Sequence, residues 1–266
     1  MYRSHGKYNR QFISIMDKKL NKDPVGSFFD ERKSDILKMN NDKKLRELSL
    51  EWMIKADQYK YSYNFTWMGI PIIKFPSDMI VQQELMWKLK PDLIIETGIA
   101  HGGSILFSAS MMEINGTQGE VVAVDIDIRK HNKKLIESHP MFKHITMYEG
   151  SSVDQNIVNK IKHHTKDKKC VMVILDSNHT HKHVLDELRI YASLVTPGSY
   201  VILPDTFIEY FPKGHYSHNR PWDVGNNPHT AMKAFLKENK NFSVDNEISN
   251  KAMISETFDG YLRRHS

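Results

Sequence analysis

The sequence predicts an α/β fold in which a doubly wound, mostly parallel sheet is covered by helices on both faces. From residue 92 onward, short apolar runs alternate with stretches of helical periodicity, and each run closes on a polar residue. A strand buried on both faces reads as a continuous apolar run, so this alternation is typical of a parallel sheet. Ligands of such sheets bind at the carboxyl ends of the strands, where these polar residues lie.

The individual elements follow from the same pattern. We expect strands at residues 93–95, 121–124, 171–175 and 200–203, and another before Gly150. The helices between them are expected at 103–114, 129–138, 153–164 and 181–193.

The N-terminal part of the chain is polar, rich in lysine and expected to be helical. There Leu45, Leu48, Trp52 and Ile54 fall near helical spacing, which predicts a docking face. Two prolines make residues 67–76 an expected extended loop, and Asp78 is the expected start of the next helix. The predicted organisation is a helical extension at 1–60 and a catalytic domain at 61–266.

Composition excludes several classes of protein. The formal net charge of the 266 residues is +5, but both signs are spread along the chain without an arginine-rich block, so no nucleic-acid partner is expected. The single cysteine, Cys170, excludes an intrachain disulfide and a multi-cysteine zinc site, and we expect it to be a small buried residue. No apolar run suits a signal peptide or a membrane span, so we expect a cytoplasmic protein without a membrane partner.

The first strand leads into a glycine-rich turn and then a helix. In the turn, Gly98, Ala100 and Gly103 would let backbone approach a ligand, and Ser104 begins the helix. The spacing is also a degraded form of the nicotinamide-binding fingerprint. Glu96 before the turn favours S-adenosylmethionine, because a carboxylate suits a cationic ligand and not a pyrophosphate.

Two further strand ends are candidates for the same ligand. Asp125 could accept hydrogen bonds from two ribose hydroxyls; the alternative is a helix N-cap, for which Asp127 is the better candidate. Ser151 and Ser152 could meet an adenine ring; the alternative is a plain turn with an N-cap serine.

Carboxylates end the next two strands and predict a metal site. Asp176 and Asp205 would lie at adjacent strand ends, facing the cofactor turn, where they could hold one hard divalent ion. His179, three residues after Asp176, could take a proton from a substrate hydroxyl. The alternative is that both aspartates cap helices and that His179, like His181 and His183, lies at a wet surface.

At these residues the chain resembles the cephalosporin hydroxylase / rhamnosyl O-methyltransferase family, which is similar to Mg-dependent macrolide-sugar O-methyltransferases. The matching segments are 67–71 (WMGIP), 91–98 (PDLIIETG), 102–104 (GGS), 175–179 (LDSNH), 183–185 (HVL), Tyr191, 197–200 (PGSY), 205–206 (DT), 220–222 (RPW), 225–228 (GNNP) and 259–262 (DGYL).

The resemblance implies a methyltransferase fold, S-adenosylmethionine as cofactor, Mg²⁺ or another divalent cation held by Asp176 and Asp205, and His179 as the base. Asp176 is also expected at the cofactor. The chain departs from the family at Pro204, where an acidic residue is usual. The segment 203–206 (LPDT) resembles instead catechol-type methyltransferases, which makes Thr206 a third expected metal ligand.

These observations predict O-methylation of a small polyhydroxylated acceptor, most plausibly a sugar or a natural product. The long segment from Phe211 to Pro228 is expected to be a lid or a substrate wall, with an oligomer contact as the alternative. The two asparagines before Pro228 are expected to start a helix. The chain is expected to form a homo-oligomer. The rival functions are a nicotinamide-dependent oxidoreductase and a methyltransferase-like binding module without catalysis.

Overall fold

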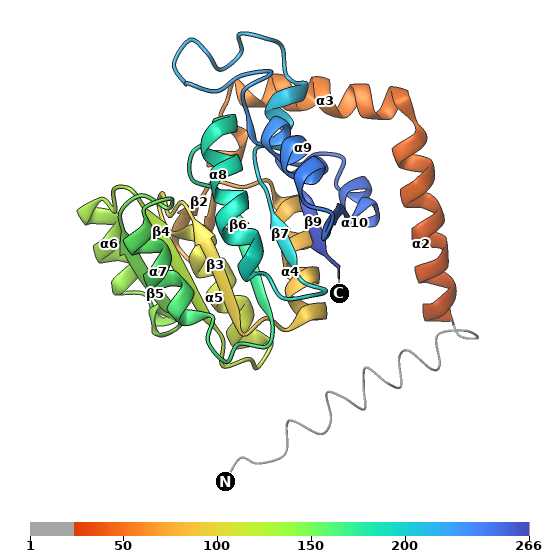
Figure 1. Ribbon diagram of the computed structural model, residues 1–266. Helices are drawn as coiled ribbons and strands as arrows, with labels where there is room; N and C mark the ends of the chain where they lie inside the picture. The colour runs from red at the N-terminus through yellow and green to blue at the C-terminus, as the bar shows by residue number, and fades with distance from the viewer. Residues whose placement is uncertain (1–23, 266) are drawn as a thin grey trace.

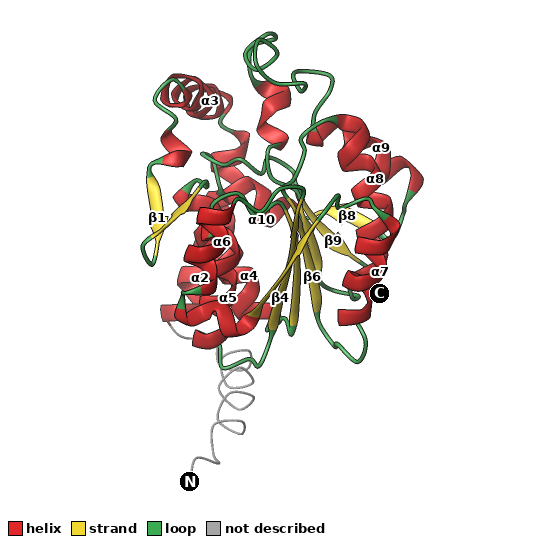
Figure 2. Ribbon diagram, turned by 90° about the vertical axis from the view of Figure 1, so that its left-hand side faces the viewer, coloured by secondary structure: helices red, strands yellow, loops and turns green. Residues whose placement is uncertain are grey.

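The computed structural model describes residues 24–265 and contains the predicted sheet (Figure 1, Figure 2). Seven strands lie in the order β5-β4-β3-β6-β7-β9-β8. Only the last of them in the chain, β9, runs antiparallel to its neighbours. The predicted fold class is confirmed. The strands are β3 (Leu93–Thr97), β4 (Glu120–Asp125), β5 (Ile145–Glu149), β6 (Val171–Leu175), β7 (Tyr200–Ile202), β8 (Phe242–Val244) and β9 (Tyr261–Arg264).

Helices cover both faces of this sheet, as Figure 2 shows. Successive side chains of a strand point to opposite faces, so Ile94 of β3 joins one apolar core while Leu93 and Ile95 join the other. The first core lies under α4 (Pro76–Leu89), α5 (Gly103–Ile114) and α6 (Lys130–Glu137). The second lies under α7 (Gln155–His164), α8 (His181–Tyr191) and α9 (Pro228–Glu238).

The topological switch point lies between β3 and β6. The chain runs outward from β3 to β4 and β5 and then returns to β6 on the other side of β3. Gly98 directly follows β3 with φ of +91°, and a Cβ at this position would lie 2.0 Å from the carbonyl oxygen of Asp176. Only glycine therefore lets the two strand ends come this close.

The N-terminal extension is helical over its described part, with α2 (Pro24–Asn41) and α3 (Lys43–Asp57); the expectation for residues 1–23 lies outside the described chain. The predicted docking face is correct in part. Ile54 packs against the cluster of Met53, Phe75 and Phe207, and the Trp52 ring meets the Tyr61 ring edge-on at 4.9 Å, whereas Leu45 and Leu48 are 38% and 51% exposed. The buried side of α3 carries Ser49 and Met53, one turn apart. The boundary at residue 60 stays a prediction.

The expected loop at residues 67–76 is instead a short hairpin. Its strands β1 (Phe65–Trp67) and β2 (Ile70–Ile72) are joined by Met68 and Gly69, which have φ of +48° and +88°. Two central residues with positive φ suit a tight hairpin turn. α4 then begins at Pro76, two residues before the predicted start, because proline fits the first helical turn, where its missing N–H is not needed.

The C-terminal part contains the predicted helix after the asparagine pair. Asn227 caps α9 through a reciprocal capping box with Thr230. A further short helix, α10 (Asn246–Lys251), contacts α2 and precedes β9. Among residues 24–265, no helix is both long enough and apolar enough to cross a bilayer.

Candidate active site

The turn between β3 and α5 has the backbone conformations that a closely held ligand needs. Gly98 and Gly102 have φ of +91° and +93°, and Ala100 between them has φ of +46°. Gly103 packs against the hairpin, since a Cβ there would lie 2.4 Å from the carbonyl oxygen of Pro71. Of the predicted cofactor residues, Gly98, Ala100, Gly103 and Ser104 therefore form one turn at the N-terminus of α5, where helix N–H groups are free to bind a ligand.

Two polar atoms beside this turn are buried without a hydrogen-bond partner. They are Oε2 of Glu96 and Oγ of Ser104. Burial raises the pKa of Glu96 to about 7, although Lys74 and the nearby Ser104 hydroxyl oppose the shift. A cationic ligand beside Glu96 would favour its ionised form. The unpaired atoms thus fit the ammonium-bearing end of S-adenosylmethionine.

Asp125 binds the glycine-rich turn directly. Its Oδ2 accepts hydrogen bonds from the backbone N–H of Ile99 at 2.7 Å and of Ala100 at 3.1 Å, and its Oδ1 accepts from Asp127 N–H at 3.1 Å. The N-cap of α6 is Arg129, so the capping alternative is wrong for both aspartates. A carboxylate has about four lone-pair sites, and Asp125 therefore keeps acceptor capacity for a ribose.

The loop after β5 brings Ser152 to a polar cluster under α8. Oγ of Ser152 lies 3.1 Å from Nε2 of His183, and the same nitrogen lies 3.2 Å from Oγ of Ser177. The N-cap of α7 is Asp154, so the alternative of an N-cap serine is wrong. Ser151 precedes Ser152 and is half-buried. The cluster joins the loop after β5 to the loop after β6.

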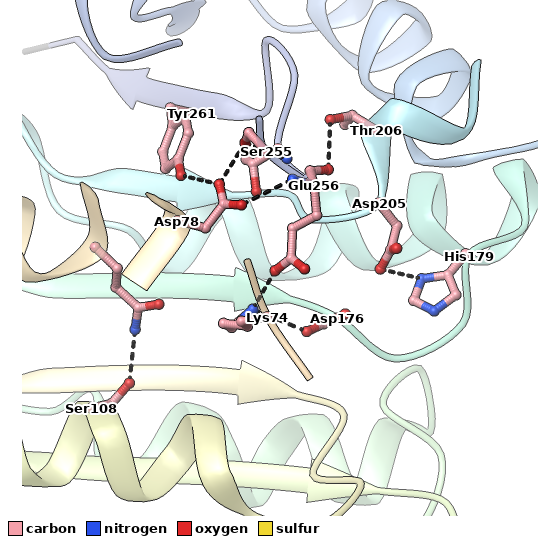
Figure 3. A network of polar contacts seen from close by, with 12 residues as sticks. Lys74, Asp78, Ser108, Asp176, His179, Asp205, Thr206, Ser255, Glu256 and Tyr261 are labelled. Atoms are coloured by element: carbon pink, nitrogen blue, oxygen red, sulfur yellow. Dashed lines mark hydrogen bonds and ion pairs between the residues drawn. The ribbon is translucent and has the colours of Figure 1, made fainter. Parts of the chain in front are cut away.

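The three predicted residues of the metal and base site lie together at the ends of β6 and β7. Ligand atoms of Asp176, His179 and Asp205 all lie within 4.8 Å of one another, and Nδ1 of His179 is 3.3 Å from Oδ2 of Asp205 (Figure 3). The capping alternative is wrong, because Thr180 is the N-cap of α8 and Asp205 makes no side-chain cap.

This cluster fits a divalent cation. Burial, followed by the neighbouring Asp176, raises the pKa of Asp205 well above its ordinary value. Two carboxylates held this close repel each other, and a hard cation between them would relieve the repulsion. Burial lowers the pKa of His179, so its imidazole is neutral near pH 7.

Thr206, the third predicted ligand, points elsewhere. Its Oγ1 donates to the carbonyl oxygen of Glu256 at 3.4 Å, and the residue is fully buried (Figure 3). Pro204 is buried too. The structure thus brings Asp176 and Asp205 together but does not bring the Thr206 hydroxyl to them.

Lys74, which no sequence pattern identified as a site residue, is a buried cation beside the cluster. Nζ of Lys74 lies 3.4 Å from Oδ2 of Asp176 and 2.8 Å from Oε1 of Glu256. Lys74 follows β2 and Glu256 precedes β9, so the pair comes from opposite ends of the domain. No spacing or periodicity links such positions, and they were not recognisable as site residues.

The segment between Phe211 and Pro228 forms one wall of the site. The Trp222 ring meets the His179 ring edge-on at 4.6 Å, and the Arg220 guanidinium lies 5.3 Å from the Trp222 ring. Nε2 of His215 lies 2.8 Å from Oδ2 of Asp57 and ties the segment to α3. The expectation of a substrate wall fits this placement.

Known proteins are similar to this chain in sequence and in fold. The family model for rhamnosyl O-methyltransferase/CmcI matches residues 59–265. A rhamnosyl O-methyltransferase of Mycobacterium leprae is 30% identical over 219 residues, covering 79% of this chain and 90% of the relative. Its counterpart in Mycobacterium tuberculosis (strain ATCC 25618 / H37Rv) is 31% identical over 204 residues, covering 75% and 78%.

Solved structures share the same architecture. A CmcI structure described as its Mg-SAM form superimposes with a TM-score of 0.54 at 22% identity, covering 77% of this chain and 78% of that one, which supports the fold alone. The family match decides against the nicotinamide-dependent alternative. The chain belongs to the rhamnosyl O-methyltransferase/CmcI family and is an S-adenosylmethionine-dependent O-methyltransferase.

Proposed function

We propose that the protein methylates a hydroxyl group of a sugar or a similar polyhydroxylated small molecule, with help from a divalent cation. The observation that carries the proposal is the cluster of Asp176, His179 and Asp205 at the switch-point edge of the sheet. The Trp222 ring beside His179 supplies an aromatic wall for the acceptor. The mycobacterial relatives, named rhamnosyl O-methyltransferases, support a sugar acceptor.

Each residue has a defined task in this proposal. Glu96, the glycine-rich turn and Asp125 hold the cofactor, and Asp176 with Asp205 holds the cation. When bound, S-adenosylmethionine supplies an electrophilic methyl group and Mg²⁺ supplies Lewis-acid stabilisation of an oxygen anion.

His179 accepts the proton of the acceptor hydroxyl. Asp205 faces Nδ1 of His179, which leaves Nε2 as the proton acceptor. With a bound S-adenosylmethionine, the hydroxyl oxygen would take the methyl group, S-adenosylhomocysteine would be the leaving group, and Nε2 of His179 would hold the hydroxyl proton. Holding oxygen, carbon and sulfur in line is the main contribution of the site.

The direct test is methyl transfer from labelled S-adenosylmethionine to a panel of rhamnosides and other glycosides. We expect product with a subset of the sugars, loss of turnover in excess EDTA, and recovery on addition of Mg²⁺ or Mn²⁺. Full turnover in EDTA would contradict the role of the cation. Binding of S-adenosylhomocysteine without turnover of any glycoside would contradict a sugar acceptor.

We also propose that the chain self-associates. Large apolar side chains of α2 and α3 are exposed, among them Phe28 (60%), Leu37 (58%) and Leu48 (51%). Exposed apolar patches commonly mark protein contacts. Light scattering after size exclusion tests this, and a monomer at every concentration would contradict it.

A further inference from the structure

Lys74 is a buried cation among carboxylates, outside both the cofactor turn and the proposed set of metal ligands. Its side chain is only 3% exposed, and lysine is rarely buried to this degree unless it is paired. Its Nζ lies 2.8 Å from Oε1 of Glu256 and 3.4 Å from Oδ2 of Asp176, so the buried ammonium lies between two carboxyl groups.

The stronger partner of Lys74 is itself held in place. The backbone N–H of Glu256 donates to Oδ2 of Asp78 at 2.9 Å. The hydroxyls of Ser255 and Tyr261 donate to Oδ1 of Asp78 at 2.5 and 2.9 Å (Figure 3). Asp78 thus clamps the segment before β9 onto α4, and this clamp fixes where Glu256 can hold the ammonium.

The backbone of the β1–β2 hairpin connects Lys74 to both the cofactor turn and the cation cluster. Its N–H donates to the carbonyl oxygen of Ser62 at 3.1 Å, directly after β2. The same strand lies behind Gly103 of the cofactor turn, where Pro71 and Ile72 leave no room for a Cβ. One hairpin therefore supports the cofactor turn and delivers Lys74 to Asp176.

We propose that Lys74 is a positioning residue for the cation site. Anchored by Glu256, its ammonium holds Oδ2 of Asp176 and thereby turns the other carboxylate oxygen toward His179 and Asp205. The proposal rests on the metal-assisted function proposed above. Outer partners of this kind orient the groups that ligate metals, and their loss typically costs about 10–100-fold in metal affinity.

A charge-balanced double variant isolates this role. Lys74→Met/Glu256→Gln removes the ammonium together with its nearer carboxyl group, so the formal charge of the site is unchanged while the contact with Asp176 is lost. Mn²⁺ affinity, measured from the electron paramagnetic resonance signal of the free ion, needs no acceptor and no turnover. We expect about 10–100-fold weaker Mn²⁺ binding, with S-adenosylhomocysteine affinity and cooperative thermal unfolding retained.

Lys90→Met is the matched control. Its ammonium lies over the Trp87 ring and 3.3 Å from Oδ1 of Asn115, away from the cluster, so its loss should leave Mn²⁺ affinity unchanged. Unchanged or tighter Mn²⁺ binding in a folded double variant overturns the proposed role of Lys74 but leaves the metal-assisted function standing. If the unmodified protein binds no Mn²⁺, both this inference and the metal-assisted function are overturned.

A second pair of variants serves if the double variant does not fold. Glu256→Gln and Glu256→Leu remove the same charge, but only glutamine keeps an oxygen that can accept a hydrogen bond from Lys74. We expect the leucine variant to bind Mn²⁺ about tenfold more weakly than the glutamine variant. Equal affinities in the two variants overturn the proposal.

Discussion

The two halves of the ligand-facing sheet edge are built in different ways. On the β3–β4 side, the cofactor turn is shaped by backbone: residues with positive φ at Gly98, Ala100 and Gly102, held by the Asp125 carboxylate. On the β6–β7 side, the cation cluster depends on side chains from distant segments, with Lys74 before α4 and Glu256 before β9. The first half is local in sequence and the second is not.

This difference has a functional consequence. A backbone turn offers N–H groups to a ligand that is the same for every member of a methyltransferase family. Side chains that converge from separate segments can change one at a time, and here they surround the acceptor side of the site. We therefore expect substitutions in the first half to alter cofactor affinity, and substitutions in the second half to alter turnover or metal affinity.

The largest difference between an effect on turnover and an effect on cofactor affinity is expected for His179→Ala. Turnover is expected to fall by about 10²–10⁴-fold, the usual contribution of a positioned general base, while S-adenosylhomocysteine affinity stays close to that of the unmodified protein. Because burial lowers the pKa of His179, activity of the unmodified enzyme should rise with pH along a limb that lies below the ordinary value of 6.5. Steady-state rates across pH measure both effects.

The control is His181→Ala. Nδ1 of His181 lies 2.8 Å from Oγ1 of Thr230, so this histidine braces α8 against α9. Retained activity in His179→Ala together with lost activity in His181→Ala would show that the assignment of the base to His179 is wrong. If both variants stay active, the cation alone activates the acceptor.

The cofactor half is tested most strongly by Asp125→Ala. The variant removes a charged acceptor from the ribose site, worth about 1.5–3 kcal/mol, and frees the amides of Ile99 and Ala100. Calorimetric titration should show S-adenosylhomocysteine binding weakened by about tenfold or more. Asp127→Ala, two residues away, should bind normally. An unchanged dissociation constant in folded Asp125→Ala would break the assignment.

The same contrast explains which features the sequence predicted. The strand–turn–helix pattern around Glu96 and Gly98 is contiguous, so periodicity and glycine placement identified the fold and the cofactor turn. Asp176 and Asp205 were predicted because parallel strands end at one edge. Lys74 and Glu256 were missed because their proximity arises only when the hairpin and β9 pack on the domain.

Three predictions from local sequence patterns differ from the structure, each for a different physical reason. The prolines near residue 71 predicted a loop, but Pro71 sits in a two-stranded hairpin, where its missing N–H is tolerated. Helical spacing of apolar residues in α3 predicted docking, yet Leu45 and Leu48 are exposed, while the buried residues of the helix are Ser49 and Met53. Thr206 was predicted from the likeness of segment 203–206 to catechol-type methyltransferases, whereas its hydroxyl donates to the carbonyl oxygen of Glu256.

A smaller effect on cofactor affinity is expected from a change of pH. The pKa of Glu96 is raised to about 7, so below that pH the buried carboxyl is neutral and must lose a proton before it can pair with a ligand ammonium. Affinity for S-adenosylhomocysteine should therefore increase as pH rises, by about tenfold between pH 6 and pH 8, and then level off. Glu96→Gln should bind weakly with little pH dependence. A flat profile in the unmodified protein would show that Glu96 does not titrate on binding.

The smallest effect is expected at Asn227, which supports the wall on the β7 side. Its side chain is fully buried, accepts a hydrogen bond from Thr230 N–H at 3.2 Å, and donates to Oε2 of Glu209 at 2.6 Å and to the carbonyl oxygen of Asp223 at 2.9 Å. Asn227→Ala removes the cap and both donors. It should lower the free energy of unfolding in urea by about 1–2 kcal/mol while Mn²⁺ and S-adenosylhomocysteine still bind.

Asn227→Ser separates the two contributions, because serine keeps a cap acceptor but lacks the amide donors. If the cap dominates, the serine variant should recover most of the lost stability. If the ties to Glu209 and Asp223 dominate, it should be as unstable as the alanine variant, and turnover should fall with it, since these ties anchor the segment that carries Trp222. Asn219→Ala, in an exposed part of the same segment, should stay within about 0.5 kcal/mol of the unmodified protein. Equal losses of unfolding free energy in Asn227→Ala and Asn219→Ala would mean that the backbone holds the wall, as it holds the cofactor turn. The two halves of the sheet edge would then not differ in this respect.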